Sequence, residues 1–375
     1  MLKRFLPTPI VFLLMLLAGG QQSSATEVTG ASERLANPFA DRWQAAPNHA
    51  ALKMPGWIVW CGSAIRGDDR RYYLFASRWP EKAGMNRWVT HSEVVVAVAD
   101  SPVGPYQFER VVLPARGPKF WDGRMTHNPT ILRHAGQYVM FYIGVNYEFD
   151  PGEGPERLAE DLYGKAWNTK RIGVATAPHP LGPWTRRDKP VLEPRPGKWD
   201  GAITSNPSAV IHDDGSVLLL YKSAPVPYPE RKRNRRLSFG LARAASIDGP
   251  FTRLNPDHPL AIDGKPTNVE DPYIWRDSRG RYHMLAKAMD SRLVPAHTGF
   301  YAYSENGFQW RLGAPAQAYD LTVHWENGNV EKLIKKERPQ VLLDGDQPIA
   351  VFFATRRQNN EIFNLAVPVR PLYKK

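Results

Sequence analysis

The sequence predicts an all-β fold, a five-bladed β-propeller, because one unit of short strands recurs five times along the chain. Each unit opens with a dipeptide, continues as an apolar strand, turns at a tip rich in Gly or Asp, and returns as a second strand. The opening dipeptides are Cys61-Gly62, Asn128-Pro129, Asn206-Pro207, Asp271-Pro272 and Arg338-Pro339. Counted on the second residue, successive openings lie 67, 78, 65 and 67 residues apart. Such spacing is typical of antiparallel sheets repeated around a ring.

We expect hairpin-centred blades that start near residues 57, 124, 202, 268 and 335, within one domain that covers residues 56–375. A third strand follows each hairpin, and in blade one it spans residues 93–99 before a tight turn with an aromatic residue. The best candidate for a helix, residues 155–166, lies in an insertion in blade two. The 34 prolines favour many short strands, since proline disrupts helix interiors.

The first 25 residues have the organisation of a secretory signal peptide, with Lys3 and Arg4 before an apolar run and a small polar tail. A buried N-terminal helix is the alternative interpretation. The segment predicts a secreted or periplasmic protein, and because no other stretch approaches spanning length, we expect no membrane span. Residues 26–55 form a polar, irregular extension, in which Asn37-Pro38 and Trp43 are expected to anchor against the ring.

The charge of the chain favours acidic partners. Its formal charge is +12, which falls to +10 when Lys3 and Arg4 leave with the signal peptide. A basic exported protein fits an anionic carbohydrate, although the basic run at residues 231–236 is most simply a solvated loop. No nucleic-acid-binding motif surrounds that run, so we expect no nucleic-acid partner. The single cysteine, Cys61, excludes an intramolecular disulfide.

The innermost strand of each propeller blade lines the central channel, so the five opening dipeptides are expected to converge at one mouth. Carboxylates stand at or near these openings in blades two to five: Asp122, Asp200, Glu270, Asp271 and Glu337. Burial and mutual repulsion of such groups would spread their pKa values, and cleavage of a glycosidic bond needs one protonated and one ionised carboxyl. For any one Asx-Pro pair taken alone, ordinary turn chemistry is the simpler interpretation.

Two phrases resemble the five-bladed propeller glycosidases of glycoside hydrolase families 43, 32, 68 and 117. They are VEDPYIWRDSRGRYHMLAK, at residues 269–287, and KKERPQVLL, at residues 335–343. The nearest likeness is to family 117, the exo-acting 3,6-anhydro-galactosidases. The resemblance implies that three carboxylates from different blades meet in the channel and that Asp271 and Glu337 are two of them. It also makes Glu270 similar to the general-acid glutamate of family 43.

The sequence departs from family 43 at the head of blade one, where Cys61 stands in place of an Asp. Because a thiol cannot replace a carboxylate as the base for attack by water, we expect the base to be Asp122, with Asp200 as the second choice. The resemblance to family 117 implies a histidine as the acid, for which His324 is the counterpart. An ordinary loop histidine is the alternative interpretation of His324.

Sugar hydroxyls or an anionic substituent are expected to contact a further group of residues at the channel mouth: His127, Asn128, Asn206, Lys222, Lys287 and Arg338. For the cations in this group, simple salt bridges to neighbouring carboxylates are the alternative. We assign no metal ligands, and the sequence leaves open whether a structural Ca²⁺ sits in the channel.

These features favour a secreted, exo-acting glycoside hydrolase that trims a terminal sugar from a plant or algal polysaccharide or its oligosaccharides without a redox cofactor. The resemblance favours an inverting mechanism. A non-catalytic glycan-binding propeller is the alternative, supported by the missing Asp of blade one. A lyase or transferase acting on an anionic glycan is a third hypothesis.

Overall fold

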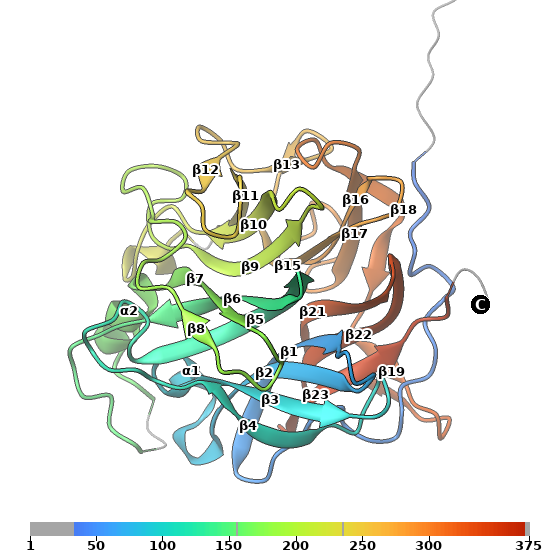
Figure 1. The fold of residues 1–375 in the computed structure, drawn as a ribbon, viewed down its shortest axis with the longest axis horizontal. Helices are drawn as coiled ribbons and strands as arrows, with labels where there is room; N and C mark the ends of the chain where they lie inside the picture. The colour runs from blue at the N-terminus through green and yellow to red at the C-terminus, as the bar shows by residue number, and fades with distance from the viewer. Residues whose placement is uncertain (1–33, 155–156, 235, 372–375) are drawn as a thin grey trace, which may run out of the picture. The chain divides into compact units, whose positions relative to one another are not determined.

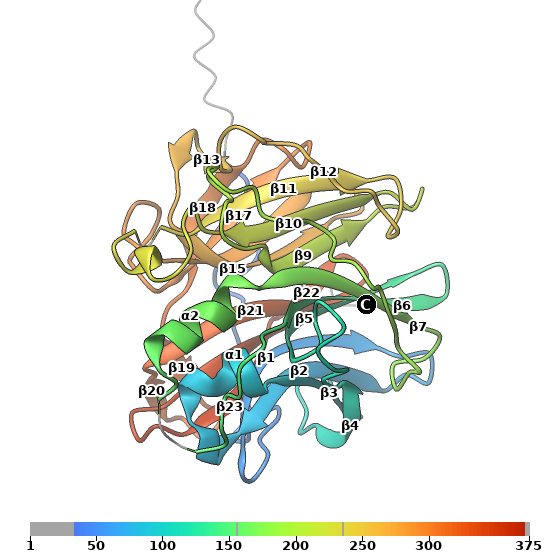
Figure 2. The same ribbon diagram turned by 90° about the vertical axis from the view of Figure 1, so that its left-hand side faces the viewer.

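Five antiparallel sheets follow one another along the chain in the computed structural model, which describes residues 34–154, 157–234 and 236–371 (Figures 1 and 2). Four sheets have four strands and the last has three, and within each sheet the strands neighbour one another in chain order. The sheets form five blades in a ring, so the predicted five-bladed β-propeller is confirmed. The predicted signal peptide, residues 1–25, lies outside the described residues.

Each blade begins with its innermost strand. Blade one contains β1 (Trp57–Arg66), β2 (Tyr72–Pro80), β3 (Glu93–Ala99) and β4 (Gln107–Leu113). Blade two contains β5 (Met125–His134), β6 (Gln137–Val145), β7 (Arg171–Ala177) and β8 (Thr185–Arg186). Blade three contains β9 (Ser205–Ile211), β10 (Val217–Ser223), β11 (Ser238–Ala244) and β12 (Thr252–Arg253). Blade four contains β15 (Val269–Arg276), β16 (Tyr282–Ala288), β17 (Gly299–Ser304) and β18 (Arg311–Tyr319). Blade five contains β21 (Lys335–Asp344), β22 (Gln347–Arg356) and β23 (Ile362–Pro368).

Helices occur only in connections between strands of the described residues. The short helix α1 (Trp88–His91) lies between β2 and β3, and α2 (Glu160–Asn168) lies between β6 and β7 and packs beside α1 (Figure 2). The helix predicted at residues 155–166 is therefore present but begins later. Two small hairpins, β13 (Ala261–Ile262) with β14 (Lys265–Pro266) and β19 (Thr322–His324) with β20 (Val330–Lys332), complete the strands. Within the described ranges, the helices are too short to cross a membrane.

A β-bulge interrupts each innermost strand at its opening dipeptide, where the pairing register with the second strand shifts. The first residue of each dipeptide has a positive φ, as found for Cys61, Asn128, Asn206, Asp271 and Arg338. A left-handed backbone is strained for residues with a side chain, and a following proline makes α-type conformations less favourable still. Each of the five bulges changes the direction in which the neighbouring side chains point, as β-bulges next to active sites often do.

Apolar side chains fill the spaces between adjacent blades. Separate clusters join blades one and two, two and three, three and four, and four and five. The ring closes through a further cluster, in which Leu74 and Val95 of blade one pack with Leu342 and Phe352 of blade five. Because β10 and its counterparts are covered on both faces, they are apolar almost throughout, which is why the second strand of each blade is so hydrophobic in sequence.

The segment that precedes blade one covers the outer edge of the three-stranded blade five. Its backbone exchanges hydrogen bonds with β23: the Ala51 N–H donates to the Asn364 carbonyl at 2.8 Å, and the Asn364 N–H donates to the Leu52 carbonyl at 3.0 Å. Trp43 Nε1 donates to the Ala318 carbonyl at 2.8 Å. An edge that would otherwise leave backbone groups unpaired is thereby protected by the chain's own N-terminal part.

The phrase WDG, which occurs twice, builds the same buried ion pair in blades two and three. Asp122 is fully buried and accepts hydrogen bonds from Arg116 Nε at 2.6 Å and from the Tyr142 hydroxyl at 2.7 Å. Asp200, also fully buried, accepts a hydrogen bond from Arg253 Nε at 2.6 Å. Two arginines pair with each carboxylate: one from the connection that precedes the blade's first strand, Arg116 or Arg195, and one from its outermost strand, Arg186 or Arg253. We therefore assign both carboxylates a structural function.

Replacing Asp122 by Ala should destabilise the fold without a specific effect on the channel mouth. The substitution leaves the Arg116 guanidinium without its buried partner, a loss that typically costs about 3 kcal/mol or more of unfolding free energy. Urea unfolding followed by tryptophan fluorescence measures it. Asp188→Ala is the matched control, because Asp188 also pairs with Arg116 but is exposed, and should cost less than about 1 kcal/mol. Equal losses for the two variants would contradict this assignment.

Candidate functional site

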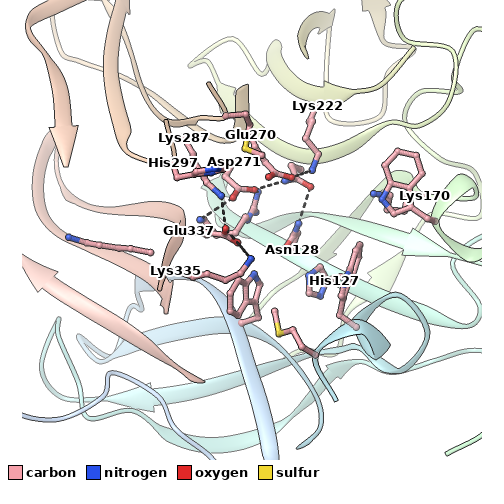
Figure 3. Close-up of a pocket in the computed structure, with 18 of the residues that line it drawn as sticks. His127, Asn128, Lys170, Lys222, Glu270, Asp271, Lys287, His297, Lys335 and Glu337 are labelled. Carbon is pink, nitrogen blue, oxygen red and sulfur yellow. Dashed lines mark hydrogen bonds and ion pairs between the residues drawn. The ribbon is translucent and has the colours of Figure 1, made fainter. Parts of the chain in front are cut away.

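A pocket of about 460 Å³ lies at the mouth of the channel where the innermost strands begin (Figure 3). Its volume is within the range of ~300–1,000 Å³ that is usual for small-molecule sites. The pocket is lined by nine of the twelve residues predicted for the site: His127, Asn128, Asn206, Lys222, Glu270, Asp271, Lys287, Glu337 and Arg338. The expected convergence of blades at one mouth is therefore observed, while the roles of these residues stay predictions.

A chain of hydrogen bonds links the opening residues of the five blades. The Cys61 thiol donates to Asn128 Oδ1. Asn128 Nδ2 donates to Asn206 Oδ1 at 3.0 Å, and Asn206 Nδ2 donates to Asp271 Oδ1 at 2.6 Å. The backbone N–H of Arg338 donates to Asp271 Oδ2 at 3.2 Å, and Arg338 Nη1 lies 3.8 Å from Asp271 Oδ1. Groups from the neighbouring blades thus fix the position of the Asp271 carboxyl.

Each glutamate of the pocket forms an ion pair with a lysine of the preceding blade. Lys222, in β10, donates to Glu270 in β15. Lys287, in β16, donates to Glu337 Oε1 in β21 at 2.5 Å, and Lys335 Nζ lies 3.3 Å from the same oxygen (Figure 3). Salt bridges, the alternative expected for the lysines from sequence, are therefore observed for Lys222 and Lys287.

The adjacent carboxyls of Glu270 and Asp271 have pKa values that move in opposite directions. Burial raises the pKa of Glu270, but the positive charges of Lys222 and Lys287 outweigh burial and lower it to about 2. Burial and the negative charge of Glu270 raise the pKa of Asp271 to about 6, against the effects of Arg338 and the two lysines. One of the two groups therefore stays ionised while the other holds a proton closer to neutrality, which is the pattern of paired acid–base groups.

His127 is held as a neutral imidazole in the wall of the pocket. Its Nδ1 is hydrogen-bonded to Ser92 Oγ at 2.8 Å, and its ring lies 4.9 Å from the ring of Trp88 between centroids. Burial, followed by the charges of Arg338 and Lys170, lowers the pKa of His127 well below its ordinary value. A neutral imidazole can form a hydrogen bond with a sugar hydroxyl at its second nitrogen.

Sequence reasoning missed the residues that the insertions bring to the pocket. Trp88 of α1, Tyr163 and Trp167 of α2, and Lys170 just after α2 all line it. Their signal in the sequence was the length of the connections between the second and third strands of blades one and two. The aromatic residues in those long connections form part of the pocket wall beside the channel mouth. Ligand-binding residues are often carried in this way by loops on a rigid scaffold.

Three predicted catalytic residues do not line the pocket. Asp122 and Asp200 are buried in arginine pairs of their blades, so the expectation that one of them joins Asp271 and Glu337 in the pocket is wrong. His324 is exposed in β19 and lies outside the pocket lining, so its predicted place there is wrong too. Asp122 and Asp200 are therefore interpreted as structural carboxylates, and His324 as an ordinary surface histidine.

The thiol of Cys61 does not take part in acid–base or nucleophilic chemistry. Burial raises the pKa of the Cys61 thiol to about 12, although the nearby charge of Arg338 opposes this, so the thiol is neither a base nor a nucleophile at ordinary pH.

The opening residues of the five blades do not form a calcium site. Ca²⁺ prefers six to eight oxygen ligands. The ring that Cys61, Asn128, Asn206, Asp271 and Arg338 form contains a thiol, one carboxylate and a guanidinium, which does not fit a structural Ca²⁺.

The sequence matches no family model and no curated relative, whereas the fold is similar to many solved structures. A family 117 glycoside hydrolase produced by the marine bacterium Zobellia galactanivorans has a TM-score of 0.59 and 18% identity, over 88% of this chain and 89% of that chain. A family 43 beta-xylosidase/alpha-arabinofuranosidase from a compost microbial metagenome, in complex with xylotriose, has a TM-score of 0.55 and 14% identity, over 89% and 96%.

A third structure, of a family 43 enzyme from Xanthomonas citri, has a TM-score of 0.52 and 14% identity, over 90% of this chain and 94% of that chain. The resemblance to five-bladed propeller glycoside hydrolases that the sequence implied is thus confirmed for the fold. At these identities the reaction has to be argued from the pocket itself.

Replacing Asp271 by Asn should preserve folding and lower kcat on a cleaved glycoside by about 100-fold or more, because the amide keeps the shape but cannot supply a proton. Steady-state kinetics and circular dichroism measure the two effects. Asp188→Asn, at an exposed position away from the pocket, is the control and should leave kcat unchanged. Unchanged turnover in Asp271→Asn would remove Asp271 from the acid–base groups.

Proposed function

We propose that the protein is an exported, exo-acting glycoside hydrolase that removes a terminal sugar from a plant or algal polysaccharide or its oligosaccharides. The observation that carries the proposal is the meeting of three carboxyls, Glu270, Asp271 and Glu337, in one pocket that also holds neutral and cationic hydrogen-bond donors. Glycosidic cleavage requires such a set of carboxyls with separated pKa values. The likeness in fold to glycoside hydrolases supports the same reaction class.

The electrostatics of the pocket suggest a role for each carboxyl. Asp271, whose pKa is raised, donates its proton to the leaving oxygen as the glycosidic C–O bond breaks. Glu337, which is paired with Lys287 and Lys335, takes a proton from water while the water oxygen forms a bond to the anomeric carbon. Glu270 does not react: its negative charge keeps the proton on Asp271. This assignment differs from the resemblance to family 43, which pointed to Glu270 as the acid, because two lysines keep Glu270 ionised.

The size and walls of the pocket support exo-action. Its volume of about 460 Å³ lies in the lower part of the range for small-molecule sites, and aromatic side chains of the insertions rise beside it. Such a pocket fits the end of a polysaccharide better than an internal segment, which needs an open groove. Indole rings also present flat apolar surfaces on which sugar rings pack.

We propose inversion at the anomeric carbon. The resemblance favours it, and in the proposed mechanism the attacking group is a water molecule activated by Glu337. Proton NMR of the first product formed from a cleaved glycoside tests this. Appearance of the opposite anomer first is expected, and appearance of the same anomer first would instead require a covalent intermediate.

A non-catalytic glycan-binding propeller remains the alternative, and the lysine pairing of both glutamates favours it. A lyase or transferase acting on an anionic glycan is a third possibility that product analysis distinguishes: a lyase leaves an unsaturated sugar, and a transferase leaves a new glycoside. The deciding experiment is incubation of the purified protein with a panel of plant and algal oligosaccharides. Released monosaccharide is expected, and its loss in Glu337→Gln assigns it to this site. Tight glycan binding without any product would favour the alternative.

Replacing Glu270 by Gln should move the alkaline limb of the kcat/KM profile to lower pH. The acid must be protonated, so activity falls as pH rises through the pKa of Asp271, and removal of the neighbouring negative charge lowers that pKa. The profile of Glu305→Gln, an exposed carboxylate elsewhere, should not move. A shift of the limb to higher pH, or none, would contradict the role assigned to Glu270.

A further inference from the structure

Cations outnumber carboxylates among the residues that line the pocket. Six cationic side chains line it, Lys170, Lys222, Lys287, Lys335, Lys336 and Arg338, against the three carboxyls of Glu270, Asp271 and Glu337. Five of the six cations have a charged or hydrogen-bonding partner within the protein, although the contact of Arg338 with Asp271, at 3.8 Å, is an ion pair and not a hydrogen bond. Lys222, Lys287, Lys335 and Arg338 pair with the carboxyls, and Lys336 Nζ donates to the Thr322 carbonyl at 3.1 Å.

Lys170 is different. Across the ranges that the structure describes, its Nζ has neither an ion pair nor a hydrogen bond, although the residue is only 1% exposed. Lys336 also lacks a carboxylate, but its ammonium is hydrogen-bonded to a carbonyl. The ammonium of Lys170 lies 3.8 Å from the ring centroid of Trp167 and 5.4 Å from that of Trp88. These indole faces attract a cation but do not neutralise it. Lys170 therefore lines the pocket as a buried cation without a counter-charge.

The position of Lys170 is fixed by the backbone. Its N–H donates to the Trp167 carbonyl at 3.3 Å, and its own carbonyl accepts a hydrogen bond from the Thr204 N–H at 3.3 Å. In Figure 3 it lies on the side of the pocket away from Glu337 and Lys335. The backbone of Lys170 is thus held in position without a ligand, and the residue lies on the opposite side of the pocket from Glu337, the proposed base.

Burial and the charge of Lys222 lower the pKa of Lys170 well below its ordinary value, although Glu270 partly opposes them. Burying an ammonium without a partner is unfavourable, and an anionic group on a ligand would relieve that cost through a charge-assisted hydrogen bond. A neutral sugar would gain no such interaction. His127, neutral on the same wall, contributes no second charge.

We propose that Lys170, framed by Trp88 and Trp167, is a subsite for a carboxylate or sulfate carried by the terminal sugar of the substrate. The inference rests on the proposed function for its assumption that a sugar occupies the pocket. It narrows the substrate class to acidic glycans, and it assigns specificity to a residue that is separate from the three carboxyls.

The test is isothermal titration calorimetry with acidic sugars and their neutral counterparts. The pairs are galacturonate with galactose, glucuronate with glucose, and galactose 6-sulfate with galactose, so that carboxylate and sulfate are distinguished. At least one acid should bind about tenfold more tightly than its neutral counterpart, as one charge-assisted hydrogen bond would give. Lys170→Met should abolish the preference, Lys170→Arg should keep most of it, and the exposed Lys189→Met should leave it unchanged.

Circular dichroism checks that the variants fold. If Lys170→Met does not fold, Lys170→Gln replaces it in the same test. The inference is overturned if no acid is preferred, or if a folded variant without the charge keeps the preference. Binding is measured without turnover, so the two proposals fail separately. Acid binding that depends on Lys170 with no hydrolysis would reject only the proposed function, and hydrolysis of neutral glycosides with no acid preference would reject only this inference.

Discussion

The left-handed backbone at the head of each innermost strand is the constraint on which the site depends. In a regular strand, neighbouring side chains point to opposite faces, so adjacent carboxyls could not share one pocket. The bulge at Asp271 removes this restriction, and both Glu270 and Asp271 line the channel mouth. Such backbone strain typically costs ~1–3 kcal/mol per residue, and here the hydrogen bonds that run from Cys61 to Asp271 hold it in place.

The same arrangement explains the electrostatics. Because each lysine reaches from the second strand of one blade to the glutamate of the next, Lys222 and Lys287 stabilise the negative charges of Glu270 and Glu337. The charge of Glu270 in turn favours the proton on Asp271. Packing between blades therefore determines which carboxyl is ionised, and substitutions at either lysine would act on the chemistry without contact with the reacting bond.

The repeat in the sequence predicted the fold and the convergence of nine site residues, since both follow from spacing and from the position of the openings. The assignment of Asp122 and Asp200 failed for a physical reason. Each lies six residues before the Asn of its opening dipeptide and outside the channel, where arginines of the preceding connection and of the outermost strand, such as Arg116 and Arg253, pair with it. The side chains of the pocket walls could not be predicted either, although the long connections that carry them are visible in the sequence. The positions of Trp88 and Lys170 depend on how two insertions pack against each other, which no local pattern encodes.

The proposed mechanism depends on the separation of the pKa values of two adjacent carboxyls, Glu270 and Asp271, on one bulge. Carboxyl ¹³C NMR of labelled protein, with resonances assigned through the Asn and Gln variants, tests it most directly. We expect Glu270 to titrate below, and Asp271 above, the ordinary carboxyl pKa of about 4. Titration of both near that value, or in the reverse order, would contradict it.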